Sequence, residues 1–501
     1  MKNSLVTRLS AEIDPVGFLE ATARAVGASA KNPLGVARAT GEFASRMGRI
    51  PGAATRVTFG IGDAPRCPES TRDRRFSDVA WSENPAYYTI AETYFAARGY
   101  ALDLIEVGGD DSTDTAKARA FVEMMWDAIS PYNSPFTNPK VLITAINTGG
   151  KSLARGAQHA LSDAATRNGK PLRVDMDAFT VGENMACTPG QVVYRNELME
   201  LIQYAPQTED VHAVPLLASP PWINKYYVMD LAPDRSLIEW AIRHGRTVFA
   251  ISYRNPDADM SSVTFDDYLE LGIRSALEVV QEITGAQKVD LTAVCLGGAM
   301  AAIAAGTGDQ RIGNLTLINT LLDYSDVGQL GLMTDPETLD KLEVLMAKRG
   351  YLPGAAMADT FDILRANDLI FDYWVSRWML GEKPPVNDHV VPWTSSYTGA
   401  RLFGSGVRYV QSNGGHIAGI VNPPDKRSWT AAVGDPEELE QAAMPADPEA
   451  WREAATVQEN SWREDWVRWN TPRAGERQTP PTMGSKAHPP LEAAPGSYVR
   501  N

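Results

Sequence analysis

One cysteine of this chain lies where a catalytic nucleophile would be expected. An apolar segment, Val289–Val294, runs into Cys295, then through Leu296 and two glycines into a run of small residues. This order predicts a strand, a sharp turn and a helix, with Cys295 on the turn as in a nucleophile elbow. An elbow needs small residues two positions before and two after the nucleophile, and Ala293 and Gly297 occupy those positions.

The alternative for Cys295 is a buried structural cysteine at the end of a core strand, a common place for a free thiol. The second glycine, the helix of tiny residues and the downstream partners favour the nucleophile. The other two cysteines, Cys67 and Cys187, lack such a context and are interpreted as structural.

An aspartate and a histidine that suit this nucleophile follow it in the chain. His416 lies in the sequence NGGHIAG after a predicted strand, and the preceding glycines allow the loop unusual dihedral angles. Asp388 lies in NDHVVPW. The order nucleophile, acid, histidine is that of the α/β-hydrolases, and it disfavours His389 as the base. The alternative for Asp388 is a turn residue that bonds its own backbone. The remaining histidines are interpreted as structural: His159, His212, His244, His389 and His488.

Two backbone N–H groups are expected to form an oxyanion hole. In this type of site one donor belongs to the residue after the nucleophile, which is Leu296. The second comes from the loop after an early strand, here around Trp222 and Ile223, and we assign it to Ile223.

The elements around these residues predict an α/β fold. Residues before about 190 show helical spacing and no strongly strand-like run, whereas apolar runs alternate with amphipathic helices from about Glu197, as in a mostly parallel sheet. One such helix begins at Thr264, which forms a potential capping box with Asp267. Its apolar residues are expected on one buried face: Phe265, Leu269, Ile273, Leu277 and Val280. The strand candidates are 211–219, 247–253, Val289–Val294, 315–322 and 407–411.

This pattern predicts three regions. Residues 1–195 form a helical N-terminal domain, and 196–434 form an α/β-hydrolase-like catalytic domain with a short cap over about 324–386. Residues 435–501 form a helical and extended tail that we expect to be loosely packed, because it ends rich in proline.

Composition excludes several classes of function. The formal net charge of −15 argues against a general binder of nucleic acids or anionic membranes. Three cysteines without a CxxC pair argue against disulfides and zinc sites. The N-terminus lacks the apolar core of a secretory signal, and no apolar run is long enough to span a bilayer, so we expect a cytoplasmic protein.

The chain resembles the class I poly(3-hydroxyalkanoate) synthases in several motifs. AVCLGG resembles their lipase-like box with Cys as nucleophile, and PPWINKYYVMDLAPDRSLIEWAIRHG resembles their most recognisable segment. DHVVPW and GGHIAGIVNPP resemble the acid and histidine segments. Further matches, such as DRRFSDVAWSENP, TPGQVVYRNELMELIQYAP and NSWREDWVRWN, extend the resemblance over nearly the whole chain. Ala293 departs from the glycine usual in the family, a change of one methyl group.

The resemblance implies an acyltransferase that polymerises (R)-3-hydroxyacyl-CoA, with 3-hydroxybutyryl-CoA as the expected substrate, and releases CoA. A cysteine nucleophile suits this reaction, because exchange of a CoA thioester for a cysteine thioester keeps the acyl group activated. His416 would form the thiolate and Asp388 would orient the imidazole. The resemblance further implies no cofactor, a homodimer, and association with polyester granules.

A second departure from the family concerns the region before Asp388. Family members carry there the rest of a cap and the strand that delivers the aspartate. Here MLGEKPPVN directly precedes Asp388, and Pro384 and Pro385 cannot lie in a central strand. Residues 381–387 reach about 25 Å at full extension, which bridges a gap but adds no strand. The resemblance therefore implies an internal deletion, and three explanations stay open: a natural deletion, an error of sequence assembly, and a rewired edge of the sheet.

The deletion predicts a sheet without one strand between 315–322 and 407–411, or a sheet with those two strands adjacent. In either arrangement a loop alone would hold Asp388. Two alternatives to an active synthase stay open: a catalytically impaired relative that binds granules or pairs with an active synthase, and a thioesterase or depolymerase on the same fold.

Overall fold

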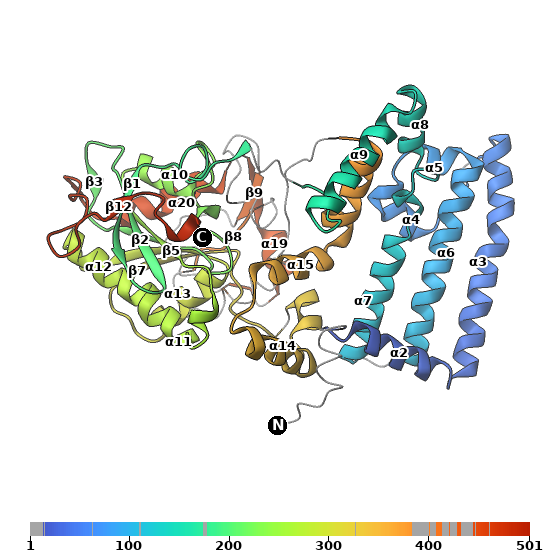
Figure 1. The fold of residues 1–501 in the computed structure, drawn as a ribbon, viewed down its shortest axis with the longest axis horizontal. Helices are drawn as coiled ribbons and strands as arrows, with labels where there is room; N and C mark the ends of the chain where they lie inside the picture. The colour runs from blue at the N-terminus through green and yellow to red at the C-terminus, as the bar shows by residue number, and fades with distance from the viewer. Residues whose placement is uncertain are drawn as a thin grey trace. The chain divides into compact units, whose positions relative to one another are not determined.

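The protein divides into two compact units in a computed structural model, which describes residues 14, 16–62, 64–109, 112–173, 178–325, 327–382, 400, 407–412, 420, 428–431, 444–445, 447–459 and 461–500 (Figure 1). Unit 1 consists of residues 1–175 and 328–386, and unit 2 of 176–327 and 387–501. Unit 1 therefore joins the N-terminal helices to most of the segment expected to form the cap. The three predicted regions, with boundaries at 195 and 434, stay a prediction.

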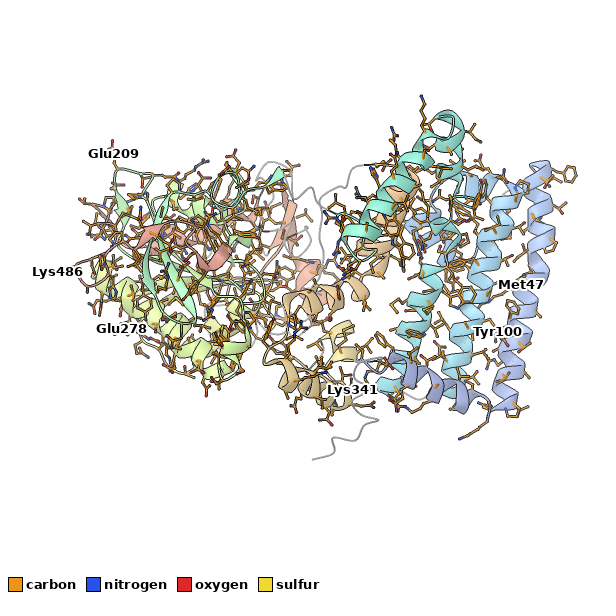
Figure 2. The ribbon with its side chains drawn as sticks, in the orientation of Figure 1. Met47, Tyr100, Glu209, Glu278, Lys341 and Lys486 are labelled. Atoms are coloured by element: carbon orange, nitrogen blue, oxygen red, sulfur yellow. The ribbon has the colours of Figure 1, made fainter. Side chains whose placement is uncertain are left out.

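Unit 1 is helical, and its long helices begin at strong capping residues. Asn32, Asn84 and Asn138 each accept a backbone N–H of the first turn, and each precedes a proline at the first helical position. Both features favour helix initiation. Tyr100 stacks on Phe43 with ring centroids 4.9 Å apart, so two of the long helices pack together (Figure 2). The helices are α2 (Phe18–Ser29), α3 (Pro33–Phe59), α4 (Pro68–Arg72), α5 (Ala80–Glu83), α6 (Pro85–Gly108), α7 (Thr113–Ala128), α8 (Pro139–Asn147), α9 (Lys151–Thr166), α14 (Pro336–Arg349) and α15 (Gly354–Leu364), with π-helical turns η8 (Asn367–Phe371) and η9 (Trp374–Met379).

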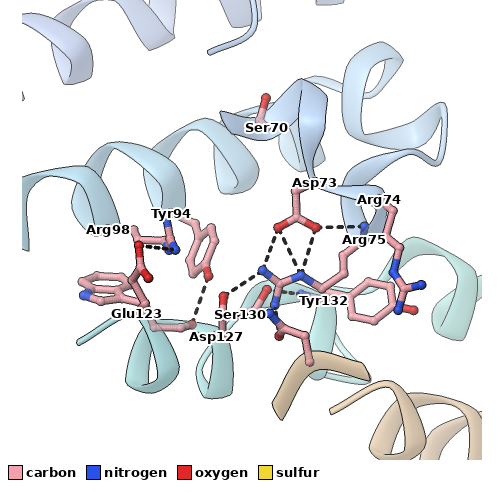
Figure 3. A network of polar contacts seen from close by, with 12 residues as sticks. Ser70, Asp73, Arg74, Arg75, Tyr94, Arg98, Glu123, Asp127, Ser130 and Tyr132 are labelled. Atoms are coloured by element: carbon pink, nitrogen blue, oxygen red, sulfur yellow. Dashed lines mark hydrogen bonds and ion pairs between the residues drawn. The ribbon is translucent and has the colours of Figure 1, made fainter. Parts of the chain in front are cut away.

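A buried arginine joins the two chain segments of unit 1. Arg75 donates to Asp73 at 2.6 Å and to Asp127 at 2.8 Å, and Figure 3 shows its side chain between them. Its other nitrogen donates to Asn367 Oδ1 at 2.6 Å. Because these carboxylates hold the charged form, the pKa of Arg75 lies above its ordinary value even though burial opposes ionisation.

Two further buried ion pairs connect the same segments. Arg377 in η9 donates to Asp163 in α9 at 2.7 Å, and Trp378 Nε1 donates to the same carboxylate at 2.9 Å. Lys117 in α7 pairs with Asp335 at 2.5 Å, just before α14 begins. Residues 328–382 are therefore fixed to the N-terminal helices by charged side chains.

Unit 2 is built around a seven-stranded sheet of order β12-β1-β2-β5-β4-β6-β7. Pairing from β12 through β1 and β2 to β5 is antiparallel, and pairing through β5, β4, β6 and β7 is parallel. The strands are β1 (Gly190–Arg195), β2 (Met199–Tyr204), β4 (Leu216–Ser219), β5 (Val248–Tyr253), β6 (Val289–Val294), β7 (Ile312–Ile318) and β12 (Glu492–Ala493).

Helices cover both faces of this sheet. Successive residues of a strand point to opposite faces. Phe249 and Ile251 of β5 therefore belong to a core with α12 (Ser275–Thr284) and α13 (Leu296–Gly306). Val248 and Ala250 belong to a second core with α10 (Leu237–Arg243) and α20 (Trp462–Asn470). The strand that precedes Cys295, β6, lies in the parallel half and is buried along its whole length.

Several predicted elements are confirmed and others are wrong. Residues 247–253 and Val289–Val294 form β5 and β6, and the residues described before 190 are mainly helical. The predicted strand 211–219 is two strands: β3 (Val211–His212) pairs with β11 (Arg477–Gln478), and β4 begins after Pro215. The hairpin of β1 and β2 was not predicted. Only a short turn separates the two strands, so their apolar residues did not stand out as two separate strands.

The predicted core strand at 407–411 is also wrong. In its place β8 (Val410–Ser412) lies in a separate antiparallel sheet with β9 (Ser428–Ala431) and β10 (Thr456–Glu459). The strand predicted at 315–322 is β7, which ends at Ile318. Within the described residues the large sheet ends at β7, so β7 and β8 are not adjacent strands.

The helix with the predicted capping box is confirmed with one difference. Thr264 and Asp267 form both bonds of the box. Leu269, Ile273, Leu277 and Val280 are buried, but Phe265 is 52% exposed. A π-helical segment, Tyr268–Arg274, follows the first turn, and its longer repeat shifts the apolar face away from Phe265.

The C-terminal tail packs tightly on unit 2, contrary to expectation. β12 pairs with β1 at the edge of the sheet. The buried carboxylate of Glu200 accepts the backbone N–H of Ser497 at 3.1 Å and that of Tyr498 at 3.0 Å, and Arg195 donates to it at 2.6 Å. The tail is thus part of the folded core of unit 2.

Candidate active site

Cys295 lies on a strained turn between β6 and α13, as the sequence predicted. Its φ of 53° and ψ of −123° are unusual for a residue with a side chain. Such strain costs on the order of 1–3 kcal/mol and persists only where neighbours enforce it. Here Cys295 N donates to Ile318 O of β7 at 3.0 Å, and Cys295 O accepts the N–H of Gly298 at 2.9 Å. The fold therefore holds the thiol at the carboxyl end of a central parallel strand.

The glycines of the elbow are required by close packing. A Cβ at Gly297 would overlap the carbonyl oxygens of Ser219 and Pro220, and a Cβ at Gly298 would overlap the side chain of Thr320. Ala293, two residues before the nucleophile, is fully buried in the core with its methyl group accommodated. The loop after β4 consequently lies directly against the first turn of α13.

The electrostatics of Cys295 call for a base. Burial raises the pKa of the Cys295 thiol above its ordinary value, and the N–H of Leu296 offsets only part of this. The thiol is therefore protonated at neutral pH unless another group takes its proton. A base is needed for reactivity, because the thiolate is the reactive form of a cysteine. The N–H of Leu296 interacts with the sulfur from the start of α13, where helix N–H groups favour negative charge.

The second predicted oxyanion donor lies in a turn fixed by aromatic packing. The ring of Trp222 contacts those of Phe265 at 5.9 Å and Tyr268 at 5.0 Å between centroids. Since Pro220 of the same loop abuts Gly297, the loop passes beside the elbow. The role of the Ile223 N–H stays a prediction.

One residue near the nucleophile was not anticipated from the sequence. Partial burial of Tyr324, which is still 54% exposed, raises the pKa of its phenol, and the charge of Cys295 contributes to the same shift. Tyr324 lies shortly after the end of β7, and β7 pairs with β6, the strand that leads to Cys295. The available signal in the sequence was therefore its place just after a predicted strand.

The structure leaves the other two triad candidates unplaced. Asp388 and His416 lie outside the described residues, as does His389. The ring of each described histidine contacts a carbonyl or carboxylate oxygen: His159 the carbonyl of Arg377, His212 that of Gly475, His244 that of Trp240, and His488 the carboxylate of Glu282.

The remaining cysteines have no nucleophile geometry. Cys67 precedes α4, where its sulfur accepts the N–H of Ser70 at 3.4 Å, and burial raises its pKa to about 11. Burial also raises the pKa of Cys187. Within the described part of the chain, no group of His, Cys, Asp and Glu side chains is arranged to hold a metal ion. Nor does any described helix have the length and apolar character needed to cross a bilayer.

Comparisons with known proteins identify relatives over most of the chain. Residues 72–241 match the family described as poly-beta-hydroxybutyrate polymerase (PhaC) N-terminus, and residues 216–362 match the alpha/beta hydrolase fold family. The match to the alpha/beta hydrolase fold family and the parallel half of the sheet confirm the predicted α/β fold class. An enol-lactonase structure from Burkholderia xenovorans LB400 has 15% identity and a TM-score of 0.24, covering 44% of this chain and 91% of that chain, which is too low to support an inference.

Three curated relatives are named poly(3-hydroxyalkanoate) polymerases. Poly(3-hydroxyalkanoate) polymerase 1 of Ectopseudomonas oleovorans is 35% identical over 502 residues, covering 88% of each chain. The Methylorubrum extorquens polymerase is 34% identical, covering 91% of this chain and 84% of the relative. The polymerase subunit PhaC of Cupriavidus necator is 33% identical, covering 85% and 83%. Since 88% of a 501-residue chain is fewer than 502 positions, the first alignment includes positions of the relative that have no counterpart here.

Proposed function

Since the chain belongs to the poly(3-hydroxyalkanoate) polymerase family, we propose that it is an acyltransferase that polymerises (R)-3-hydroxyacyl-CoA into polyhydroxyalkanoate. The expected substrate is 3-hydroxybutyryl-CoA, and the released product is CoA. The strained elbow geometry of Cys295 is the single observation that carries the mechanism.

In the proposed first step the Cys295 thiolate attacks the thioester carbonyl. A carbon–sulfur bond forms to Cys295, the bond to the CoA sulfur breaks, and CoA leaves as a thiolate that takes up a proton. His416 removes the Cys295 proton, which the raised pKa of the buried thiol makes necessary. Asp388 orients the imidazole. The N–H groups of Leu296 and Ile223 stabilise the oxyanion, and loss of one such donor costs roughly 3–4 kcal/mol of barrier.

In the second step the 3-hydroxyl group of another acyl unit attacks the Cys295 thioester. An ester bond forms, the cysteine thiolate leaves, and the hydroxyl proton passes to His416. The acyl group keeps its activation until this step because a cysteine thioester is similar in energy to the CoA thioester. Water must be excluded for the chain to grow, since otherwise the acyl-enzyme is hydrolysed. A cap over the site would serve this purpose, and the reaction is proposed to need no cofactor.

We further propose that the enzyme works as a homodimer at the surface of cytoplasmic polyester granules. The relatives' names as poly(3-hydroxyalkanoate) polymerases support contact with a polyester product, and unit 1 has large apolar side chains that are exposed. These are Leu34, Phe59, Ile61, Phe136, Ile143, Ile146 and Leu161.

The test is incubation of the purified chain with (R)-3-hydroxybutyryl-CoA. We expect free CoA together with insoluble polyester. The Cys295→Ala variant should form no acyl-enzyme, while the matched Cys67→Ala and Cys187→Ala variants should retain it. Soluble 3-hydroxybutyrate without polymer would instead identify a thioesterase or depolymerase. Folded protein that releases no CoA would identify the catalytically impaired relative.

That last alternative is favoured by a specific observation, the positions of the relatives that have no counterpart here. They fit an internal deletion before Asp388 without locating it. Insertion of a relative's segment between Pro385 and Asn387 should then raise both polymer synthesis and thermal stability. If the unaltered chain already equals a full-length relative in both, the deletion hypothesis is wrong.

A further inference from the structure

Three neighbouring side chains of α20 contact three separate parts of unit 2. The first contact reaches the sheet: Trp466 Nε1 donates to Thr316 Oγ1 of β7 at 3.1 Å. β7 is also the strand whose Ile318 O accepts the backbone N–H of Cys295. Two hydrogen bonds therefore connect α20 through β7 to the backbone of Cys295.

The second contact is an ion pair with the residue that leads into β8. Asp465 accepts two hydrogen bonds from Arg408, each 2.8 Å long. The side chains are only 11% and 13% exposed, so water screens the pair weakly. This fork-shaped geometry fixes orientation as well as distance. Arg408 precedes His416 by eight residues.

The third contact lies on the other side of that histidine. Arg463 is 1% exposed and donates to the backbone carbonyl of Ile420, four residues after His416. Its Nε has no hydrogen-bond partner among the described residues. Burial lowers the pKa of Arg463 to about 10, so it stays charged at neutral pH. Ile420 is itself buried, in the apolar core that Val294 and Trp466 share.

We propose that Arg463 and Asp465 are positioning residues for the catalytic histidine. Acting through Ile420 and Arg408, they hold both flanks of the chain around His416 against the sheet that carries Cys295. Burial of a charged arginine is costly unless it is hydrogen-bonded, and here the hydrogen bond goes to the carbonyl of Ile420, four residues after the histidine in the chain. This inference rests on the proposed function, because it presumes that His416 is the base for Cys295.

The test compares variants of adjacent residues on α20. Asp465→Asn removes the ion pair, whereas Glu464→Gln removes the neighbouring exposed carboxylate and serves as the matched control. His416→Ala provides the reference for loss of the base. The readout is the rate of Cys295 alkylation by iodoacetamide as a function of pH, followed on the peptide that contains Cys295 in the full chain. Circular dichroism confirms that each variant is folded.

We expect Asp465→Asn to slow alkylation at pH 7 by about tenfold. The rise of the alkylation rate with pH should also move to higher pH, towards the profile of His416→Ala. Glu464→Gln should match the unaltered chain. The exchanged pair Arg408→Asp with Asp465→Arg should recover part of the lost rate, because it restores the ion pair. The shift of the pH profile in the folded Asp465→Asn variant is the result that a purely structural role would not predict. Arg463→Lys should retain more of the rate than Arg463→Met. If Asp465→Asn fails to fold, the exchanged pair and the Arg463 variants decide.

Two results would overturn the inference, and they are distinguishable. If His416→Ala shifts the profile but the folded Asp465 and Arg463 variants do not, the positioning role is wrong while the proposed function stands. If His416→Ala leaves the profile unchanged, the pairing of His416 with Cys295 fails, and the positioning role fails with it.

Discussion

The two units join distant parts of the chain by different means. In unit 1 residues 328–382 meet the N-terminal helices through buried charges, such as Arg377 with Asp163 and Lys117 with Asp335. In unit 2 distant segments meet mainly through strand pairing and two extensive apolar cores, to which a few buried ion pairs such as Arg408 with Asp465 are added. A helix satisfies its backbone hydrogen bonds internally, so only side chains can specify its neighbour, whereas a strand edge specifies a neighbour through the backbone itself.

The comparison predicts that a single charge matters most in unit 1. Arg377→Met should lower the free energy of unfolding by up to about 3–5 kcal/mol, because the buried Asp163 would lose its buried cationic partner and keep only hydrogen bonds and a longer ion pair with the half-exposed Arg167. Urea unfolding followed by labelling of Cys67, which lies in unit 1, measures this effect. The double variant Arg377→Met with Asp163→Leu should recover most of the stability. A single variant as stable as the parent would show that charge does not hold this unit together.

In unit 2 the corresponding change is loss of apolar volume. Leu291 of β6 is fully buried, so Leu291→Ala should cost about 3 kcal/mol through lost burial and a residual cavity. Labelling of Cys187, which lies in unit 2, reports the transition. Because no charge changes, the loss should be the same in low and high salt. A loss that depends on salt would weaken the contrast between the units.

Acid sharpens the comparison further. Burial opposes ionisation of Asp163, but hydrogen bonds from Arg377, Trp378 and Leu172 outweigh it, so the pKa of Asp163 lies below its ordinary value. A carboxylate of this kind stabilises the fold above its unfolded pKa of about 3.9, and the stabilisation is lost as pH falls through the folded pKa. The urea midpoints of the parent and of Asp163→Asn should therefore stay apart at pH 6 and begin to converge only as the pH falls below about 4. Midpoints that stay equally far apart would contradict the assignment.

The smallest effect is expected for a surface pair that joins the same segments of unit 1. Lys170 contacts Asp359, and both side chains are about half exposed. Lys170→Met should change the free energy of unfolding by less than about 1 kcal/mol, since water screens exposed ion pairs. The same urea titration as for Arg377→Met serves here. A change as large as that of Arg377→Met would mean that burial does not determine how much an ion pair of unit 1 contributes to the free energy of unfolding.

Local sequence pattern predicted the elements but not their long-range partners. The elbow was predictable because strand, cysteine and small-residue helix are contiguous, and β6 has the predicted bounds. The attachment of residues 328–382 to the N-terminal helices was not, because Arg377 and Asp163 are 214 positions apart and leave no periodic signal. The same holds for β12 on β1 and for β8 outside the large sheet.

The candidate site shows the same limit. Cys295 and Leu296 follow from one contiguous motif, and the structure gives them the expected geometry. Tyr324 was missed because its relation to Cys295 depends on two strands being neighbours. Asp388 and His416 were chosen from chain order alone, and their roles stay proposals.

The pairing of β12 with β1 has a consequence for how the chain is made. A ribosome releases β1 about 300 residues before β12, so the nascent sheet has an open edge for most of synthesis. Throughout that time Glu200 lacks the N–H groups of Ser497 and Tyr498 and has Arg195 to neutralise it. Open strand edges pair readily with other chains. The nascent protein therefore keeps this edge of the sheet open until β12 has been made and has paired with β1.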